Sequence, residues 1–360
     1  MTKRKQIVLT GGGTAGHVMV NLAIIPILKQ DGWKIDYIGS KKGIERDLIE
    51  NLEGITYHPI STGKLRRYAS IENFKDPFKV LNGIRQATMI LHRLKPQVIF
   101  SKGGFVSVPV LMASRLKGVP AIIHESDITP GLANKLAMPF AKRILATFPE
   151  TLDHLSKEKA KWIGAVIRPE LFEGDQGAGL KMADLDRSKP VMMVMGGSAG
   201  SKRLNEAVRE QLDTLLATYQ VIHICGKDHL DSTIHRRGYK QFEYVNKGLP
   251  DLLAATDVVV SRAGANAIFE FLALKKPMLL IPLSRQASRG DQILNAKAFE
   301  KQGYAHVLYE EDLNDQSFIK KVNGLTKNKD QIKNAMNQYE RQDATQRVID
   351  ELYQLAKSIK

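Results

Sequence analysis

The 360-residue sequence has one cysteine, few aromatic residues and no long apolar run. Cys225 cannot form a disulfide within the chain, which favours a reducing compartment. Aromatic residues make up 7% of the chain, so stacking platforms for single-stranded nucleic acid would be scarce. No apolar run approaches the roughly 18 residues that cross a bilayer. The opening "MTKRKQIVLT" leads into a predicted strand, unlike a signal peptide. We expect a soluble protein that at most binds a membrane surface.

Positive charge is abundant. Lys and Arg number 53 against 38 Asp and Glu, a formal net charge of +15. Such an excess favours phosphorylated substrates, anionic lipid surfaces or nucleic acid. Zinc-ligand spacing and a Lys/Arg-rich tail are both missing, so nucleic-acid binding is the minor hypothesis and no nucleic-acid partner is expected.

Short apolar strands alternate with amphipathic helices, and this alternation starts again after the polar stretch 173–190. It predicts an α/β protein with two Rossmann-like halves and parallel sheets. We expect a first domain over 1–165, a second over 166–340, and a closing helix in 341–360 that packs back on the first. The predicted strands are 5–10, 34–40, 55–60, 96–104, 120–126 and 143–147, then 190–200, 220–226, 242–245, 257–264 and 277–283.

Each half contains glycine turns between a predicted strand and a predicted helix. They are "GGGTAGH", "SKGGFVS", "GGSAGS" and "SRAGANAIFE". The first resembles a dinucleotide-binding loop, but an NAD site also requires an acidic residue at the end of the second strand. Asp36 lies near that strand's start, so an NAD-binding oxidoreductase is a secondary hypothesis. Two halves with anion-binding turns predict one phosphorylated ligand and a second substrate.

Several residues have a structural as well as a functional interpretation. Glu270, expected at the start of a helix, could accept ribose hydroxyls or merely complement the helix dipole, and spacing alone favours the second. Ser198 could bind phosphate or cap a helix. Asp184 and Asp186 imitate a metal-binding Asp-x-Asp pair, but no apolar strand precedes them, so a solvated loop is expected. No metal ligand set is apparent from spacing.

The motifs "GGGTAGHV", "SKGGFVSVP", "HESDITPGLANK", "GGSAGSKRLN", "SRAGANAIFE" and "RGDQILNA" occur in that order. Together they resemble the MurG-type N-acetylglucosaminyltransferases of bacterial peptidoglycan synthesis. The resemblance implies a glycosyltransferase-B fold whose two Rossmann-like domains face a central cleft. It also implies an inverting transfer of N-acetylglucosamine from UDP-GlcNAc to the C4 hydroxyl of the muramyl sugar of lipid I, giving lipid II. No cofactor or metal would be required.

The resemblance also implies site residues. Arg168 would contact the diphosphate and Gln292 the donor sugar, although "AVIR" here replaces the usual Asn-Pro-Val-Arg. Asp127 stands where many relatives have asparagine, and Ala15 where they have glycine. The implied donor-binding residues are Thr14, Ala15, Gly16, Asp127, Arg168, Ser198, Val245, Ala265, Asn266, Ala267, Glu270 and Gln292. The implied acceptor-binding residues are Gly13, Gly104, Phe105, His124 and Asn134.

An inverting transfer needs a base for the acceptor hydroxyl. His17 lies beside a predicted helix N-terminus, whose dipole would disfavour the imidazolium and leave the neutral form that a base requires. The structural alternative is a histidine that only hydrogen-bonds backbone or phosphate. Glu125, at the end of a predicted strand, is the rival base. His124 could orient Glu125 or form structural hydrogen bonds.

The segment from Lys64 to Lys95 concentrates basic residues, and Phe74, Phe78 and Leu81 have helical spacing within it. We expect either a membrane face or aromatics packed into the core. An undecaprenyl-linked acceptor requires the enzyme to reach the cytoplasmic side of the bacterial cell membrane as a peripheral protein, where cell-wall and division proteins are further potential partners. The predicted membrane face comprises Arg66, Arg67, Phe74, Lys75, Phe78, Lys79 and Leu81.

Two other functions remain open at this point. A UDP-GlcNAc 2-epimerase on a related fold would share the donor site without a lipid acceptor. A basic nucleic-acid or membrane-binding scaffold would have no enzymatic product. UDP release that depends on a lipid I analogue would distinguish the transferase from both.

Overall fold

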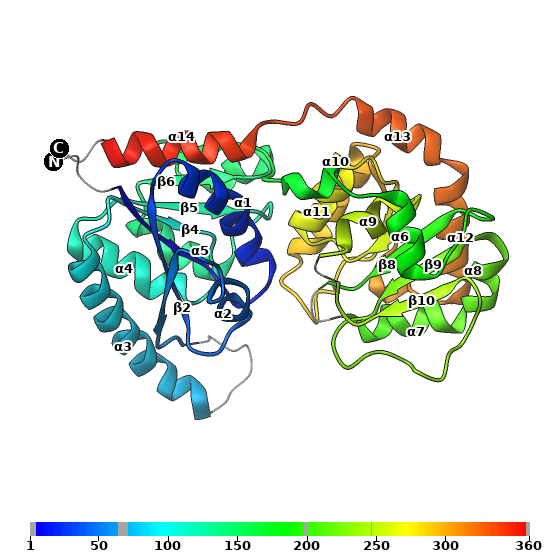
Figure 1. The fold of residues 1–360 in the computed structure, drawn as a ribbon, viewed down its shortest axis with the longest axis horizontal. Helices are drawn as coiled ribbons and strands as arrows, with labels where there is room; N and C mark the ends of the chain where they lie inside the picture. The colour runs from blue at the N-terminus through cyan, green and yellow to red at the C-terminus, as the bar shows by residue number, and fades with distance from the viewer. Residues whose placement is uncertain (1–4, 64–70, 198–199, 246, 358–360) are drawn as a thin grey trace. The chain divides into compact units, whose positions relative to one another are not determined.

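The computed structural model describes residues 5–63, 71–197, 200–245 and 247–357. The chain forms two compact units. Unit 1 comprises Met1–Val166 and Gln342–Lys360, and unit 2 comprises Ile167–Arg341. Unit 1 is therefore discontinuous in sequence, since its last segment follows the whole of unit 2. Figure 1 shows the elements of both units.

Unit 1 is built on a seven-stranded parallel sheet in the order β3-β2-β1-β4-β5-β6-β7. Its inner strands are largely buried on both faces, as in other parallel sheets, whereas the edge strands β3 and β7 are partly exposed. Ile7 and Leu9 of β1 face one cluster, and Val8 between them faces the other. The strands are β1 Gln6–Thr10, β2 Lys34–Ser40, β3 Ile55–Ile60, β4 Val98–Ser101, β5 Ala121–Glu125, β6 Arg143–Ala146 and β7 Ala160–Trp162.

Helices cover both faces of this sheet. α1 and α14 supply Ile24, Leu28, Val348 and Leu352 to one core cluster, and α14 lies beside α1 (Figure 1). α3 and α4 supply the other cluster. The helices are α1 Gly16–Gln30, α2 Ile44–Ile49, α3 Ile71–Leu94, α4 Ser107–Lys117, α5 Leu132–Ala137 and α14 Ala344–Lys357, with 3-10 turns η1 Met138–Phe140 and η2 Pro149–His154.

Unit 2 repeats the plan with a six-stranded parallel sheet in the order β10-β9-β8-β11-β12-β13. Its strands are β8 Val191–Met195, β9 Gln220–Ile224, β10 Tyr239–Phe242, β11 Val258–Ser261, β12 Met278–Leu280 and β13 Ala305–Val307. Its helices are α6 Gln176–Ala183, α7 Lys202–Glu210, α8 Leu212–Thr218, α9 Leu249–Ala255, α10 Ala265–Ala273, α11 Asp291–Lys301, α12 Asp315–Lys327 and α13 Lys329–Asn337, with 3-10 turns η3 Pro169–Phe172 and η4 Glu310–Asp312.

The predicted architecture of two parallel α/β sheets is confirmed, with differences at the sheet edges. The strand expected at 242–245 was placed wrongly: β10 pairs with β9 from Tyr239 to Phe242. The apolar residues near this edge strand did not show where the strand begins and ends. β7 and β13 were not expected, because a polar residue, Lys161 or His306, interrupts each of these three-residue strands, whereas the equally short β12 lies in an apolar run.

Each sheet reverses its strand order once, between β1 and β4 in unit 1 and between β8 and β11 in unit 2. Ligands of open α/β sheets bind at such switch points, beyond the carboxyl ends of the strands. All four predicted glycine turns follow these four strands. The fold therefore places a candidate site in each unit.

Candidate functional site

The glycine loop after β1 is held in place by hydrogen bonds from three directions. The Gly12 N–H donates to the Gly103 carbonyl of the neighbouring loop at 3.2 Å. The Tyr37 hydroxyl donates to the Gly11 carbonyl at 2.7 Å. The Gly13 N–H donates to the buried carboxylate of Glu45 at 3.0 Å. The backbone of the first candidate site is thus fixed by β2, α2 and the β4 loop.

The Gly12 carbonyl orients His17. Nδ1 of His17 lies 2.9 Å from the Gly12 oxygen and 3.1 Å from the Thr14 hydroxyl. A carbonyl can only accept, so Nδ1 carries the proton and the lone pair of the neutral imidazole lies on Nε2. The hydrogen-bonding pattern therefore presents Nε2 as the basic atom.

Burial lowers the pKa of His17 below 6.5, and the nearby Lys102 lowers it further. Glu125, the Gly12 hydrogen bond and Glu45 act in the opposite direction without reversing the result. A neutral imidazole was expected from the helix dipole, and burial and the charge of Lys102 favour the same neutral form.

Glu125, the rival base, has both carboxylate oxygens engaged. Oε1 accepts the Asp127 N–H at 3.0 Å, and Oε2 accepts the Gly131 N–H at 2.9 Å. The Asn134 amide donates to Oε2 at 2.8 Å. Glu125 is buried at the end of β5, so its carboxylate fixes the loop between β5 and α5. Three donors therefore hold this carboxylate, and through it the β5 loop.

Lys102 is a buried cation that sequence reasoning missed. It follows β4 and is 2% exposed, and its Nζ donates to the Ser126 hydroxyl. Burial lowers the pKa of its ammonium group, while Glu125 and Asp127 raise it. A lysine beside a glycine turn is usually solvated, so the sequence carried no signal that this one is enclosed.

The remaining predicted residues of unit 1 divide between the loops and the interior. Ala15 has φ −56° and ψ −39°, so alanine is unstrained at this position, where the resemblance implies a glycine in many relatives. Gly13 belongs to the same turn and Gly16 is the first residue of α1, whereas Gly104 and Phe105 belong to the loop after β4.

His124 belongs to β5 and is enclosed in the interior of unit 1. It is 1% exposed, packs near Phe100, and burial lowers its pKa well below 6.5. The His124 backbone carbonyl accepts the Asn134 amide at 3.3 Å, and the role of His124 in binding the acceptor stays a prediction.

In unit 2, two predicted donor-binding residues form a partly buried ion pair. Arg168 Nε lies 2.9 Å from Glu270 Oε1, and Arg168 Nη2 lies 3.2 Å from Oε2. The side chains are 14% and 12% exposed. Burial would lower the pKa of Arg168, but Glu270 outweighs it and raises that pKa. Burial raises the pKa of Glu270 despite the opposing charge of Arg168.

The position expected for Glu270 needs correction. α10 begins at Ala265, directly after Gly264, and its first turn contains no acid. Glu270 is the sixth residue of the helix, in its second turn, and so it does not complement the first-turn amides. Ala265, Asn266 and Ala267 form that first turn, and Gly264 at the N-cap has no side chain to cap it. Its backbone N–H groups and positive dipole end favour an anion.

Of the other predicted donor residues of this unit, Gln292 and Val245 lie in the part of the chain that the structure describes. The Gln292 side-chain oxygen accepts the Leu283 N–H at 3.1 Å, which fixes the start of α11 against the β12 loop. Val245 follows β10. Ser198 lies outside the described residues.

The structure also bears on the predicted metal and membrane features. Among the described residues, no group of three or more His, Cys, Asp or Glu could hold a metal ion. Asp186 instead accepts hydrogen bonds from Ser188 in an exposed turn, as expected for a solvated loop. Within the same described ranges, no helix combines the length and apolarity of a membrane span.

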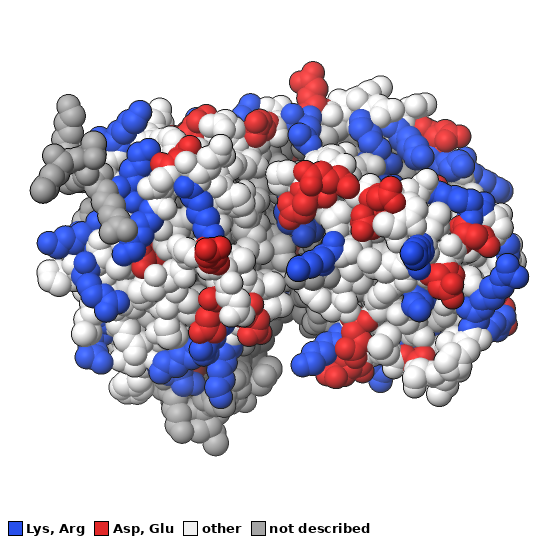
Figure 2. Space-filling model, in the orientation of Figure 1, with Lys and Arg blue, Asp and Glu red and all other residues white. Residues whose placement is uncertain are grey.

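The surface of α3 carries exposed apolar side chains. Phe78 is 74% exposed, Leu81 62% and Met89 61%, so the expected alternative of core packing is wrong for Phe78 and Leu81. Lys79 bonds to Asp76 at 3.1 Å. Arg66 and Arg67 lie outside the described residues, as do the side chains of Phe74 and Lys75. Figure 2 shows basic side chains spread among acidic ones over the visible face of each unit.

Comparisons with known proteins agree along the whole chain. The model of the glycosyltransferase family 28 N-terminal domain matches residues 7–146, and that of the C-terminal domain matches 191–352. The sequence is 58% identical over 350 residues to the UDP-N-acetylglucosamine–N-acetylmuramyl-(pentapeptide) pyrophosphoryl-undecaprenol N-acetylglucosamine transferase of Oceanobacillus iheyensis, covering 97% of this chain and 98% of that protein.

A protein of the same name from Geobacillus thermodenitrificans is 58% identical over 347 residues, covering 96% of this chain and 98% of that one. Among solved structures, MurG of Acinetobacter baumannii matches with a TM-score of 0.76 and 23% identity, covering 97% of this chain and 99% of that one.

Proposed function

We propose that unit 2 binds the donor nucleotide and that unit 1 supplies the base of the reaction. The chain belongs to glycosyltransferase family 28 and, within it, to the MurG-type N-acetylglucosaminyltransferases. The enzyme transfers N-acetylglucosamine from UDP-GlcNAc to the undecaprenyl-diphosphate-linked muramyl pentapeptide, lipid I, and so forms lipid II. The 2-epimerase alternative is not favoured, because relatives that match nearly the whole chain are transferases.

Unit 2 binds UDP in this proposal. Arg168 and Glu270 pair with one another in the structure. On nucleotide binding, the diphosphate competes for the guanidinium and the ribose hydroxyls compete for the carboxylate, both through charge-assisted hydrogen bonds. The first-turn amides of α10 add a second anion-binding element. Ser198, Val245, Asn266 and Gln292 remain proposed donor contacts, as do Thr14, Ala15, Gly16 and Asp127.

Unit 1 supplies the base, and the orientation of His17 is the observation that carries this assignment. Because Gly12 accepts from Nδ1, Nε2 can remove the proton from the C4 hydroxyl as its oxygen attacks the anomeric carbon. The bond from that carbon to the UDP oxygen breaks, and the diphosphate leaves with the electron pair. Glu125 organises the β5 loop instead, with Asn134 as its partner. Gly13, Gly104 and Phe105 stay proposed acceptor contacts.

Negative charge on the departing UDP is stabilised by Arg168 and the α10 amides, so we propose that no metal is required. Turnover should therefore persist in a chelator. Loss of activity on chelation, restored by a divalent cation, would contradict this part of the proposal.

α3 is the proposed membrane face. Phe78, Leu81, Arg85 and Met89 follow i, i+3, i+7, i+11 spacing and share one side of the helix. Their exposure suits insertion among anionic lipids, where apolar burial and basic charge act together. This face supports a peripheral location on the cytoplasmic leaflet, where lipid I is found. Partners among cell-wall and division proteins remain part of the proposal.

The test compares two variants in UDP release and UDP calorimetry. His17→Ala should slow the chemical step roughly 10²–10⁴-fold while UDP binding survives. Glu270→Ala should weaken UDP binding, because it removes hydrogen bonds worth about 1.5–3 kcal/mol each. Near-normal turnover of His17→Ala, with Glu125→Gln inactive, would exchange the roles of the two residues.

A further inference from the structure

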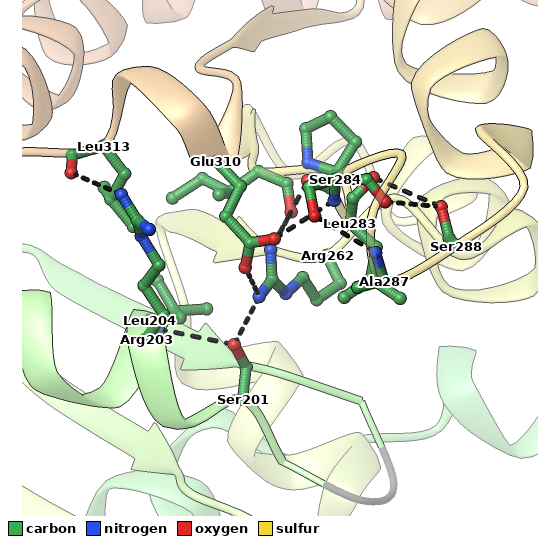
Figure 3. A network of polar contacts seen from close by, with 12 residues as sticks. Ser201, Arg203, Leu204, Arg262, Leu283, Ser284, Ala287, Ser288, Glu310 and Leu313 are labelled. Carbon is green, nitrogen blue, oxygen red and sulfur yellow. Dashed lines mark hydrogen bonds and ion pairs between the residues drawn. The ribbon is translucent and has the colours of Figure 1, made fainter. Parts of the chain in front are cut away.

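A buried network joins the loops at the carboxyl edge of the unit 2 sheet (Figure 3). Its centre is Arg262, which directly follows β11 and is 6% exposed. Arg262 Nη2 donates to the Ser201 hydroxyl at 2.6 Å and to the Glu310 carboxylate. Nη1 donates to the carbonyls of Ile281 at 3.1 Å and Pro282 at 3.4 Å. One guanidinium thus contacts the segments after β8, β12 and β13.

The same carboxylate continues the network. Glu310 is 9% exposed, and its second oxygen accepts the Ser284 N–H at 3.1 Å. Ser284 in turn bonds to Ser288 within the loop that leads to α11. Gln292, a proposed donor-sugar contact, is bonded to Leu283 of this loop. The position of that contact is therefore determined through Glu310 and Arg262.

Ser201 links the network to the other glycine turn. It caps α7, and its hydroxyl accepts the Leu204 N–H at 3.4 Å as well as the Arg262 bond. The turn that ends at Ser201 begins after β8, at the switch point of the sheet. Arg262 also lies three residues before Ala265, where α10 begins. The donor-binding turns of β8, β11 and β12 consequently share one buried cation.

A buried ion pair is weak support for stability, because desolvation offsets much of the attraction. Here Nε of Arg262 is buried without a partner among the described residues, which adds to that cost. The presence of the Arg262–Glu310 pair is therefore better explained by the positions in which it holds the loops than by a gain in stability. The guanidinium has five N–H donors in a fixed planar fork, which suits it to hold three separate segments at defined positions.

We propose that Arg262 and Glu310 are positioning residues of the donor site, setting the relative placement of the turns that bind UDP-GlcNAc. This inference rests on the proposed donor site in unit 2. Neither residue needs to touch the nucleotide, since their effect passes through Ser201, the β12 loop and Gln292.

Two variants test the role. Arg262→Lys keeps the charge opposite Glu310 but has one nitrogen in place of the fork. Arg262→Met with Glu310→Gln removes both charges together and retains a carbonyl for the Ser284 N–H. We expect each to weaken UDP binding by about 10-fold or more, with a parallel rise in the KM for UDP-GlcNAc, because small misplacements of binding groups are costly. The KM for the acceptor should not change.

Asp36→Asn is the matched control. It breaks a buried pair with His58 in unit 1, where the two atoms lie 2.7 Å apart. This variant should lose thermal stability and keep the parent's affinity for UDP. Glu270→Ala, measured in the same series, separates the two hypotheses.

If Glu270→Ala also binds UDP normally, the proposed donor site is wrong. If only the Arg262 variants bind normally, the donor site stands and the positioning role is overturned. Failure of both Arg262 variants to fold would assign the pair to folding and would equally overturn the inference.

Discussion

Gly104→Ala should slow the transfer through a clash with the carbonyl that orients His17. Gly104 has φ +83°, and a Cβ there would lie 2.0 Å from the Gly12 oxygen. Real Cβ atoms essentially never approach within 3.0 Å of such an atom, so the two loops must separate by at least about 1 Å. The Gly12 oxygen is the acceptor of the His17 Nδ1 proton. The substitution therefore moves the base without touching it.

The expected magnitude has two parts. A non-glycine residue in the left-handed region costs roughly 1–2 kcal/mol of stability. Displacing a catalytic group by about 1 Å can cost on the order of 100-fold in rate. The first part affects folding and the second affects turnover, so a suitable control separates them.

Gly118 provides that control within the same unit. It ends α4 with φ +67°, and a Cβ there would meet nothing within 4 Å. Gly118→Ala should lose similar stability and keep the parent's turnover. Acceptor-dependent UDP release and thermal melting of both variants give the comparison, and UDP calorimetry should find no change in either. Equal turnover of the two folded variants would refute the proposed link between Gly104, Gly12 and His17.

Three further predictions follow from charge and exposure. Lys102→Met removes a positive charge that lowers the pKa of His17, so the acid limb of the pH–turnover profile should move upward, starting from a parent value below 6.5; an unmoved limb would contradict this role. Arg168→Met leaves Glu270 buried alone and should cost about 3–5 kcal/mol at neutral pH. Burial raises the pKa of Glu270 above 4.5, so the folded state binds this proton more tightly than the unfolded state does. The difference in melting temperature between the variant and the parent should therefore shrink as the pH falls toward the raised pKa of Glu270. A difference that does not change with pH would count against the role of the pair. Phe78→Ser with Leu81→Ser should weaken binding to anionic vesicles, whereas Leu116→Ser, which alters a 68% exposed residue of α4, should sediment like the parent; equal behaviour of both would exclude α3 as the membrane face.

Local sequence signals predicted most of the fold. Continuous apolar runs such as that of β4 mark strands buried on both faces, and glycine turns directly after them mark the switch points. The motif around His17 likewise identified a loop that the structure holds firmly. Strands, glycine turns and the His17 loop depend on residues that are close together in the sequence, so the sequence alone is enough to predict them.

Long-range pairings were not predictable in the same way. Lys102 and Ser126 are 24 residues apart, and Arg262 and Glu310 are 48 apart. Glu45, which fixes the Gly13 N–H from 32 residues away, also had no local signature. A charged residue near a turn is normally solvated, so only the fold reveals which ones are enclosed. The start of α10 was also misplaced: the helix begins at Ala265, directly after Gly264, and Glu270, the acid expected at its start, lies in its second turn.

The discontinuity of unit 1 has a consequence for biosynthesis. Val348, Ile349 and Leu352 of α14 complete the core cluster around α1, yet they are translated after all of unit 2. Unit 2 is one continuous segment and can fold on the ribosome as it emerges, since domains generally fold as units during synthesis. The nascent first unit must wait with an apolar face of α1 uncovered until the last segment is made. A product that stops before Ala344 should therefore retain a folded second unit and require chaperones for the first.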